Sequence, residues 1–391
     1  MRILICSTSG ALGGMERRIE AEVQLLTRLG HDVLVASTKF KGLENWKSDI
    51  TDAGATYIDW RPYKFIEREQ YAAPVQWLAR ASARRIQRER IDLAHIAIPW
   101  NYVGMSMAYV LQSVNVPFIF SAHCKFGRRA LAKPGQEAVT KAMGGCVGGY
   151  AVSKPVADSV YRLYAGMIPK SLQLDTILNG IDTARFRPDK TKRHTMRQKL
   201  KFQDDHFVVI FCGRLDPMKR PLFALRAFAK FSLKHSASRL LIVGDGSERK
   251  ALEAEIASIG LQERVTFVGQ VADTSQYYSA SDCYLSTSAN QEGCPLAAAE
   301  ALASGLPAIL PDDDVFRSVY GHCKSVRLCS LDDLEDWENG LSSIASLDAR
   351  LMQSLQQVGQ EFVTAELSQE IMNTKLTSFY ERLFSNLGFK R

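Results

Sequence analysis

Two carboxylates stand around one predicted helix start in a pattern that could bind phosphate and hydroxyl groups. Glu292 precedes Gly293 and Pro295, and Glu300 follows with seven residues between the two acids. A proline at the start of a helix leaves backbone N–H groups available to an anion such as a phosphate. From inside the helix Glu300 can accept hydrogen bonds from two ribose hydroxyls, and Glu292 can reach a sugar hydroxyl.

Each acid also has a purely structural interpretation. Glu292 could offset the helix dipole from the first turn, and Glu300 could face solvent. The residues around Glu300 are leucine and alanine almost throughout 296–303, however, which predicts a buried helix. Because a lone buried carboxylate needs a partner, this context favours a functional role for Glu300.

Two cations follow an apolar run at 207–211 that predicts a strand. Arg214 and Lys219 lie five positions apart across a turn that contains Pro217. The planar fork of an arginine and the point charge of a lysine suit a diphosphate. The alternative is that both are solvated loop residues, which is the commoner state of any one arginine or lysine.

Glycines mark two further strand-to-helix turns. Gly244 and Gly246 follow a predicted strand, which is a weak signal because Asp-Gly also occurs in ordinary turns. Gly13 and Gly14 follow the first strand without the G-x-G-x-x-G pattern, and no acid ends the second strand to hold a ribose. A nicotinamide enzyme is therefore disfavoured, while a tight turn and a close approach to a ligand remain equal alternatives for Gly13 and Gly14.

Alternating strand and helix patterns predict two parallel sheets that would position these residues. Strands are predicted at 2–6, 31–36, 93–98, 118–121, 150–152 and 175–178, and in a second series at 207–211, 240–243, 265–268, 283–285 and 308–310. The polar, basic stretch 186–205 has no strand pattern and predicts a linker, and 368–387 predicts a final amphipathic helix. Ligands of such sheets bind beyond the carboxyl ends of the strands, so we expect the site in a cleft between two Rossmann-like domains.

Several motifs, taken in their order along the chain, resemble the retaining GT-B glycosyltransferases of glycosyltransferase family 4. The matching segments are Gly13-Gly14-Met15-Glu16, Asn179-Gly180-Ile181-Asp182, Gly213-Arg214-Leu215 with Lys219, Gly244-Asp245-Gly246, residues 265–269, and the E-x7-E pair Glu292 and Glu300. The resemblance implies an α/β fold of GT-B architecture, with two Rossmann-like domains facing a central cleft. Residues 1–185, completed by a C-terminal helix at 368–391, would bind the acceptor, and residues 186–367 would bind a nucleotide-sugar donor.

The resemblance also implies roles for individual residues. The reaction would be a retaining transfer from a UDP- or GDP-sugar to a hydroxyl of a glycan or lipid-linked glycan, in cell-surface polysaccharide or lipopolysaccharide assembly. The implied catalytic residues are Glu292, His123, Arg214 and Lys219. The implied donor-binding residues are Gly13, Gly14, Gly213, Arg214, Lys219, Gly244, Val271, Glu292, Gly293, Cys294, Pro295, Leu296 and Glu300. Without the resemblance, His123 would be interpreted as a hydrogen-bonded core histidine.

Neither a metal nor another cofactor is expected. Asp312, Asp313 and Asp314 follow Pro311, where an acidic run predicts a polar loop rather than a metal site. The eight cysteines include no Cys-x-x-Cys pair, which disfavours zinc and disulfides. The sequence shows neither a signal-peptide core nor an uninterrupted apolar stretch of ~20 residues, so we expect a cytoplasmic protein.

The positive charge is concentrated in the first half of the chain. The formal net charge is +7, and residues 1–180 hold 23 Lys and Arg against 15 Asp and Glu, a net of +8 that leaves −1 for the rest. This is too mild for a nucleic-acid binder, but it suggests an anionic acceptor or an anionic membrane surface at which the protein would be peripheral. A solvated helix face is an equal alternative. The residues proposed for this role are Lys125, Arg128, Arg129, Arg84, Arg85 and Arg88.

Two other functions fit the same motifs. A sugar-nucleotide epimerase of the same fold would transfer nothing to an acceptor, and a non-catalytic sugar-nucleotide binding protein would be expected to lack Glu292, Arg214 or Lys219. All three residues are present. The donor sugar, its base, the acceptor, the linkage and the oligomeric state are not encoded in these motifs, because loops that set specificity vary independently of the fold.

Overall fold

The chain folds into two compact units, one of which is built from both ends of the sequence. The computed structural model describes residues 1–8, 13–37, 42–58, 73–127, 131–289 and 292–388, without the side chains of 73–79. Unit 1 comprises residues 1–179 and 372–391, and unit 2 comprises residues 180–371.

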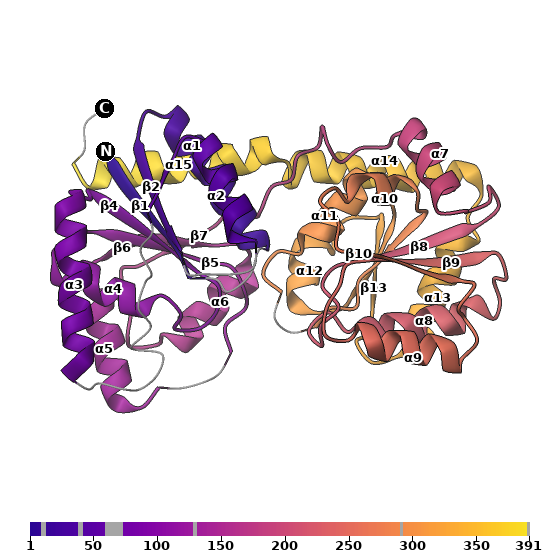
Figure 1. Cartoon of the computed structure of the whole chain (residues 1–391), viewed down its shortest axis with the longest axis horizontal. Helices are drawn as coiled ribbons and strands as arrows, with labels where there is room; N and C mark the ends of the chain where they lie inside the picture. Colours follow the sequence, from indigo (N-terminus) through magenta and orange to yellow (C-terminus); the bar gives the residue numbers. More distant parts are fainter. Residues whose placement is uncertain (9–12, 38–41, 59–72, 128–130, 290–291, 389–391) are drawn as a thin grey trace. The chain divides into compact units, whose positions relative to one another are not determined.

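Unit 1 is a seven-stranded parallel sheet in the order β3-β2-β1-β4-β5-β6-β7 (Figure 1). The strands are β1 (Arg2–Ser7), β2 (Asp32–Ser37), β3 (Thr56–Tyr57), β4 (Leu93–Ile98), β5 (Phe118–Ala122), β6 (Cys146–Ala151) and β7 (Leu174–Thr176). The helices are α1 (Gly14–Arg28), α2 (Leu43–Asp52), α3 (Ala73–Glu89), α4 (Met105–Ser113), α5 (Lys133–Met143), α6 (Lys154–Leu163) and α15 (Gln369–Asn386).

The last helix of the chain completes the core of unit 1. Alternate residues of the strands, such as Ile3 and Ile5 of β1, face the same core as α1, α2 and α15. Leu376 and Tyr380 of α15 are fully buried there. Figure 1 shows α3, α4 and α5 on the opposite side of the sheet, so both faces are covered as a parallel sheet requires.

Unit 2 is a six-stranded parallel sheet in the order β10-β9-β8-β11-β12-β13. The strands are β8 (Phe207–Cys212), β9 (Ser238–Val243), β10 (Val265–Gly269), β11 (Cys283–Leu285), β12 (Ala308–Pro311) and β13 (Val326–Cys329). The helices are α7 (Lys190–Lys199), α8 (Pro221–Ser232), α9 (Arg249–Ser258), α10 (Ser275–Ser279), α11 (Leu296–Ala303), α12 (Asp314–Tyr320), α13 (Leu334–Ala345) and α14 (Ala349–Glu366). Trp337 of α13 is fully buried in its core.

The prediction of two Rossmann-like sheets is confirmed, whereas strands β3 and β13 and helix α13 were not predicted, and three further helices depart from the sequence interpretation. The predicted linker contains α7, which Asp189 caps by accepting a hydrogen bond from the Lys192 N–H at 2.8 Å. The acidic run predicted as a loop leads into α12, whose N-cap is Asp313. The third is α14, which was not predicted. Among the described residues, no helix is long and apolar enough to span a membrane.

Candidate functional site

The carboxyl ends of β8 and β11 bring Lys219 and Glu292 together in unit 2. The two strands are parallel neighbours, so the segments that follow them meet at one edge of the sheet. The Thr287 hydroxyl donates to the carbonyls of Lys219 at 3.0 Å and Arg220 at 2.9 Å, which fixes the Lys219 turn to the segment after β11. The Lys219 ammonium donates to the Glu292 carboxylate in a close ion pair.

The environment of Glu292 keeps its carboxylate ionised. Burial alone would raise the pKa of Glu292, but the charge and hydrogen bond of Lys219 outweigh burial and lower that pKa. A hydrogen bond from Ser288 and the charge of Arg214 act in the same direction. The Arg214 side chain is 58% exposed and lies 3.2 Å from Asp216, so its guanidinium is accessible to a ligand. A carboxylate and two cations therefore gather at one sheet edge.

The glycines of the neighbouring turn allow two backbone segments to touch. A Cβ on Gly244, whose φ is +140°, would lie 1.9 Å from the Gly213 carbonyl oxygen, and a Cβ on Gly246 would lie 2.4 Å from that of Leu215. Packing thus accounts for Gly244 and Gly246. Gly213 is different, because a Cβ there would meet nothing within 4 Å, so close packing within the chain does not require a glycine at this position.

Helix α11 presents its start near Glu292 and holds Glu300 inside. Pro295 is its N-cap residue, and no side chain of the described residues caps it by a hydrogen bond. The Tyr320 hydroxyl donates to the Pro295 carbonyl at 2.6 Å and so anchors this helix start. Glu300 is half-buried rather than buried, and it accepts a hydrogen bond from the Tyr278 hydroxyl at 3.1 Å. Both the helix start and Glu300 are available for hydrogen bonds to a ligand.

The remaining predicted donor residues lie on the same side of unit 2 or at the first turn of unit 1. Gly293 and Cys294 are buried and Leu296 is half-buried at the start of α11, and Val271 is half-buried in the segment after β10. In unit 1, Gly13 is the N-cap of α1 and Gly14 begins it; both are exposed. The Gly13 N–H donates to the Glu16 carboxylate at 2.8 Å, which explains physically why a glutamate follows this glycine pair.

His123 follows β5 directly and ends a buried chain of polar side chains in unit 1. Its Nε2 lies 2.8 Å from the Ser121 Oγ, which in turn lies 2.8 Å from the Nε2 of His95. The Nδ1 of His95 lies 3.3 Å from a carboxylate oxygen of Glu22. Burial first, then the nearby Arg18 and His95, lower the pKa of His123 to about 3, so its imidazole is neutral at physiological pH.

The sequence did not lead us to predict that charged side chains belong to this buried series of polar residues. Burial alone would raise the pKa of Glu22, but His95, Arg18 and the Tyr380 hydroxyl lower it to about 2. Glu22 is fully buried, and it also accepts a hydrogen bond from Tyr150 at 2.9 Å. The usable signal was the pair Arg18 and Glu22, four residues apart, within the apolar stripe of a helix where charges are costly.

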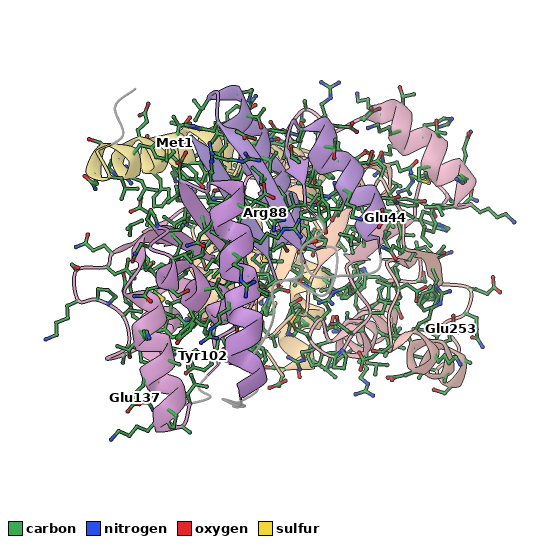
Figure 2. The ribbon with its side chains drawn as sticks, turned by 60° about the vertical axis from the view of Figure 1, so that its left-hand side comes forward. Met1, Glu44, Arg88, Tyr102, Glu137 and Glu253 are labelled. Atoms are coloured by element: carbon green, nitrogen blue, oxygen red, sulfur yellow. The ribbon has the colours of Figure 1, made fainter. Side chains whose placement is uncertain are left out.

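Three of the basic residues proposed to meet an acceptor or a membrane lie on α3 of unit 1. On α3, Arg84 and Arg88 are exposed and Arg85 is half-buried, while Lys125 is half-buried after β5. Arg128 and Arg129 lie outside the described residues. A hollow of about 450 Å³ between α3 and α4 is lined by Arg84, among other residues. Figure 2 shows Arg88 on α3, on the side of unit 1 that this view brings forward.

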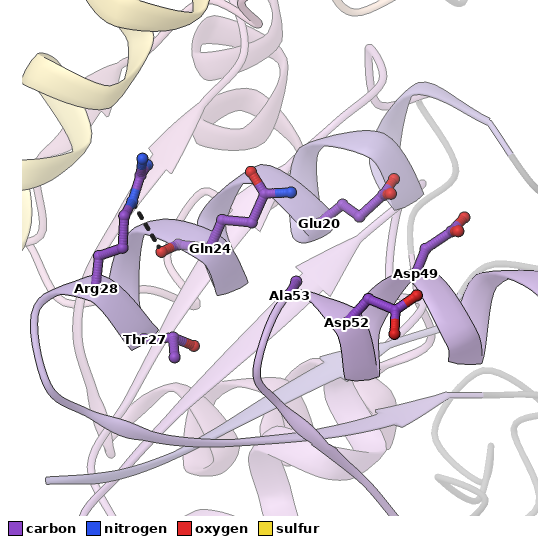
Figure 3. Close-up of a pocket in the computed structure, with 7 residues that line it drawn as sticks. All are labelled: Glu20, Gln24, Thr27, Arg28, Asp49, Asp52 and Ala53. Carbon is purple, nitrogen blue, oxygen red and sulfur yellow. Dashed lines mark hydrogen bonds between the residues drawn. The ribbon is translucent and has the colours of Figure 1, made fainter.

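A second hollow in unit 1 has the opposite charge. Figure 3 shows it between α1 and α2, with Glu20, Asp49 and Asp52 around it. Burial first, and the neighbouring Asp49, raise the pKa of Glu20, although Arg17 opposes the shift. The hollow between α1 and α2 therefore does not share the positive charge that the first half of the sequence has in surplus. Among the described residues, no group of three potential ligands could hold a metal ion.

Two family models match almost the whole chain. Residues 12–185 match the model described as Glycosyltransferase Family 4, and residues 192–361 match the model described as Glycosyl transferases group 1. The chain belongs to the GT-B glycosyltransferases.

Curated relatives of this glycosyltransferase act in several reactions. It is 25% identical over 253 residues to the alpha-monoglucosyldiacylglycerol synthase of Acholeplasma laidlawii, covering 60% of this chain and 62% of the relative. It is 32% identical over 204 residues to a D-inositol 3-phosphate glycosyltransferase of Rhodococcus opacus, covering 50% and 44%. It is 29% identical over 174 residues to an Escherichia coli UDP-Gal:alpha-D-GlcNAc-diphosphoundecaprenol alpha-1,3-galactosyltransferase, covering 44% of each. The chain thus matches less than two thirds of each of these relatives.

Solved structures confirm the fold of this glycosyltransferase over its full length. Anabaena HepE, crystallised with UDP, superposes with a TM-score of 0.80 at 19% identity over 98% of this chain and 100% of that protein. WaaG, a glycosyltransferase involved in lipopolysaccharide biosynthesis, gives a TM-score of 0.69 at 14% identity over 95% and 98% of the two chains.

Proposed function

We propose that this glycosyltransferase is a retaining enzyme that moves a sugar from a nucleotide diphosphate to a hydroxyl of a glycan or lipid-linked glycan. The observation that carries the proposal is the ion pair of Lys219 and Glu292, with Arg214 beside it, at the edge of the unit 2 sheet next to the start of α11. The curated relatives act on lipid and glycan acceptors by name, which supports this acceptor class.

The same residues supply the chemistry of the transfer. The bond from the anomeric carbon to the diphosphate oxygen breaks, and Arg214, Lys219 and the start of α11 stabilise the charge that develops on the leaving diphosphate. The acceptor hydroxyl forms the new bond on the same face, and its proton passes to a phosphate oxygen of the leaving group. Glu292 and His123 would contact the transferred sugar, and Glu300 would bind the ribose of the nucleotide.

A thermal-shift panel of nucleotide sugars tests the donor first. UDP-glucose is the first probe because HepE has been crystallised with it, and GDP-mannose is the second. A donor at ~100 times its Kd should raise the unfolding free energy by ~2.7 kcal/mol. Lys219→Met should abolish that shift, whereas Lys199→Met, on the exposed surface of α7, should keep it. No shift with any nucleotide sugar would favour a different function.

Product analysis then tests the reaction. The anomeric coupling in the proton NMR spectrum of the product should match that of the donor, as retention requires. An inverted anomer would refute the retaining mechanism, and an epimerised donor formed without acceptor would indicate the epimerase alternative. We expect the transfer to need no metal; activity that is lost with EDTA and restored by Mn²⁺ or Mg²⁺ would contradict this part of the proposal.

The acceptor is proposed to be anionic or held at an anionic membrane surface by α3. Arg84 and Arg88 are exposed there, whereas the hollow between α1 and α2 is lined by acidic residues. Liposomes of anionic lipid should float the wild-type protein at low salt. Changing Arg84, Arg85 and Arg88 to Glu should abolish flotation, and changing the exposed Arg28 of α1 should not. Equal flotation of both variants would contradict the assignment to α3.

A further inference from the structure

The buried chain that ends at His123 draws on three elements of unit 1. Glu22 comes from α1, His95 from the middle of β4, and Ser121 from β5, two residues before His123. Their contacts run in sequence: 3.3 Å from Glu22 to His95 Nδ1, 2.8 Å from His95 Nε2 to Ser121, and 2.8 Å from Ser121 to His123 Nε2. All four side chains are at least nine-tenths buried. Water therefore has little part in deciding where the protons lie.

The charges around the chain set the state of His95. Arg18 is 2% exposed and Glu22 is 0% exposed, and they carry opposite charges. Because the charges of Arg18 and Glu22 already balance, a proton added to His95 would give the buried cluster a net positive charge, which is costly. The Nδ1 of His95 makes no hydrogen bond among the described residues, but it lies 3.3 Å from a Glu22 carboxylate oxygen. The neutral imidazole therefore carries its hydrogen on Nδ1, because a lone pair at that atom would be repelled by the carboxylate.

The hydrogen of Ser121 then fixes the tautomer of His123. Because His95 carries its hydrogen on Nδ1, its Nε2 is a hydrogen-bond acceptor, and the Ser121 hydroxyl donates to it. The Ser121 oxygen is left as the acceptor for His123, so His123 carries its hydrogen on Nε2. Its Nδ1 keeps a lone pair, and that atom is buried without a hydrogen-bond partner among the described residues.

We propose that Glu22, His95 and Ser121 are positioning residues that hold His123 as the Nε2–H tautomer, with its Nδ1 as a hydrogen-bond acceptor for a hydroxyl of the transferred sugar. The contact with the sugar rests on the proposed function, whereas the tautomer does not. The sugar's hydroxyl would donate to Nδ1 without any change of protonation in the protein. The same chain prevents the ring from turning its N–H toward the sugar.

Nitrogen-15 NMR of the histidine rings at pH 8 tests the tautomer without a substrate. The chain has seven histidines, and the signals of His123 are identified by their loss in His123→Gln. We expect an unprotonated Nδ1 and a protonated Nε2 in the wild type, a mixture of tautomers in Ser121→Ala, and the wild-type pattern in Ser121→Thr, which keeps the hydroxyl. A protonated Nδ1 in the wild type, or a pattern that Ser121→Ala does not alter, would overturn the proposal.

Kinetics with UDP-glucose test the consequence. Ser121→Ala should lower kcat, measured as the rate at which UDP is formed from UDP-glucose, about tenfold, because one hydrogen bond to the sugar is misdirected. The affinity for UDP should stay unchanged. Tyr380→Phe is the matched control, because it removes a donor to Glu22 and leaves the chain from Glu22 to His123 in place. Equal losses of kcat in both variants would refute the positioning role. No turnover by the wild type would count against the proposed function and leave the NMR result to decide the tautomer.

Discussion

The ion pair of Lys219 and Glu292 makes a quantitative prediction about stability. The Lys219 and Glu292 side chains are 22% and 11% exposed, so the pair is neither fully exposed nor fully buried. A surface ion pair contributes about 0–1 kcal/mol, and breaking a buried pair costs about 3–5 kcal/mol. Lys219→Met leaves the Glu292 carboxylate desolvated with only Ser288 and Arg214 to support it. We expect this change to lower the unfolding free energy of unit 2 by about 2 kcal/mol at pH 7.

Substitution of the other member of the pair, Glu292, should lower the unfolding free energy by less. In Glu292→Gln the lysine keeps its charge, but its long side chain can reach water, so we expect a loss of at most about 1 kcal/mol. The double variant should resemble Glu292→Gln, which corresponds to a coupling energy of about 2 kcal/mol, the full cost of Lys219→Met. Hydrogen exchange of the buried β8 amides measures these free energies for unit 2 alone.

The stability of the same variants should change with pH in a direction that can be checked. The pKa of Glu292 is lowered in the wild type, so the pair stabilises the fold above the ordinary value near 4.5 and loses its effect as pH falls below it. Without Lys219, burial raises the pKa of Glu292, which makes protonation favourable near pH 4. The deficit of Lys219→Met should therefore shrink from pH 7 to pH 4. A deficit that stays constant, or one no larger than that of Glu292→Gln, would refute this account of the pair.

Other predictions concern single residues elsewhere. Gly246→Ala should destabilise unit 2 by more than about 3 kcal/mol because the new Cβ meets the Leu215 carbonyl, whereas Gly213→Ala should change stability by less than about 0.5 kcal/mol and weaken UDP binding; calorimetry and UDP titration separate the two effects. His123 has its pKa lowered to about 3, so it costs stability as pH falls from about 6.5 toward 3, and His123→Gln should flatten that part of the stability profile by at most about 1.4 kcal/mol per pH unit. Leu376→Ala should lower the stability of unit 1 by about 2–5 kcal/mol, read from hydrogen exchange of β1, and leave β8 unchanged.

The parallel sheets were predictable because most of their strands are apolar runs of three to six residues bounded by turn residues. The run at 93–98 became β4 with the predicted bounds. The missed helices had weaker signals. Helix α7 contains a single apolar residue, Met196, so apolar periodicity could not reveal it, and its cap Asp189 stands within a charged stretch. Helix α12 has only seven residues, and its cap Asp313 was interpreted as part of a loop.

Sequence patterns predicted the parts of the site that lie within one segment of the chain. They did not predict the contacts between segments that are far apart in the sequence. Pro295 and Glu300 belong to one helix, so their spacing carries the information. The pairing of Lys219 with Glu292 depends on the adjacency of β8 and β11, which no local pattern encodes. The polar series from Glu22 to His123 joins residues of α1, β4 and β5, which are far apart in the sequence.

The placement of α15 has a consequence for the synthesis of this protein. A ribosome releases residues 1–179 long before Leu376, Phe379 and Tyr380 exist, so the nascent unit 1 lacks part of its core while unit 2 already has all of its sequence. We expect unit 2 to fold first, although it is second in the chain. Unit 1 stays open until α15 has been synthesised, and Glu22 then gains the hydroxyl of Tyr380 as a donor. A truncated translation product would therefore expose apolar surface and be removed before the polar chain to His123 is assembled.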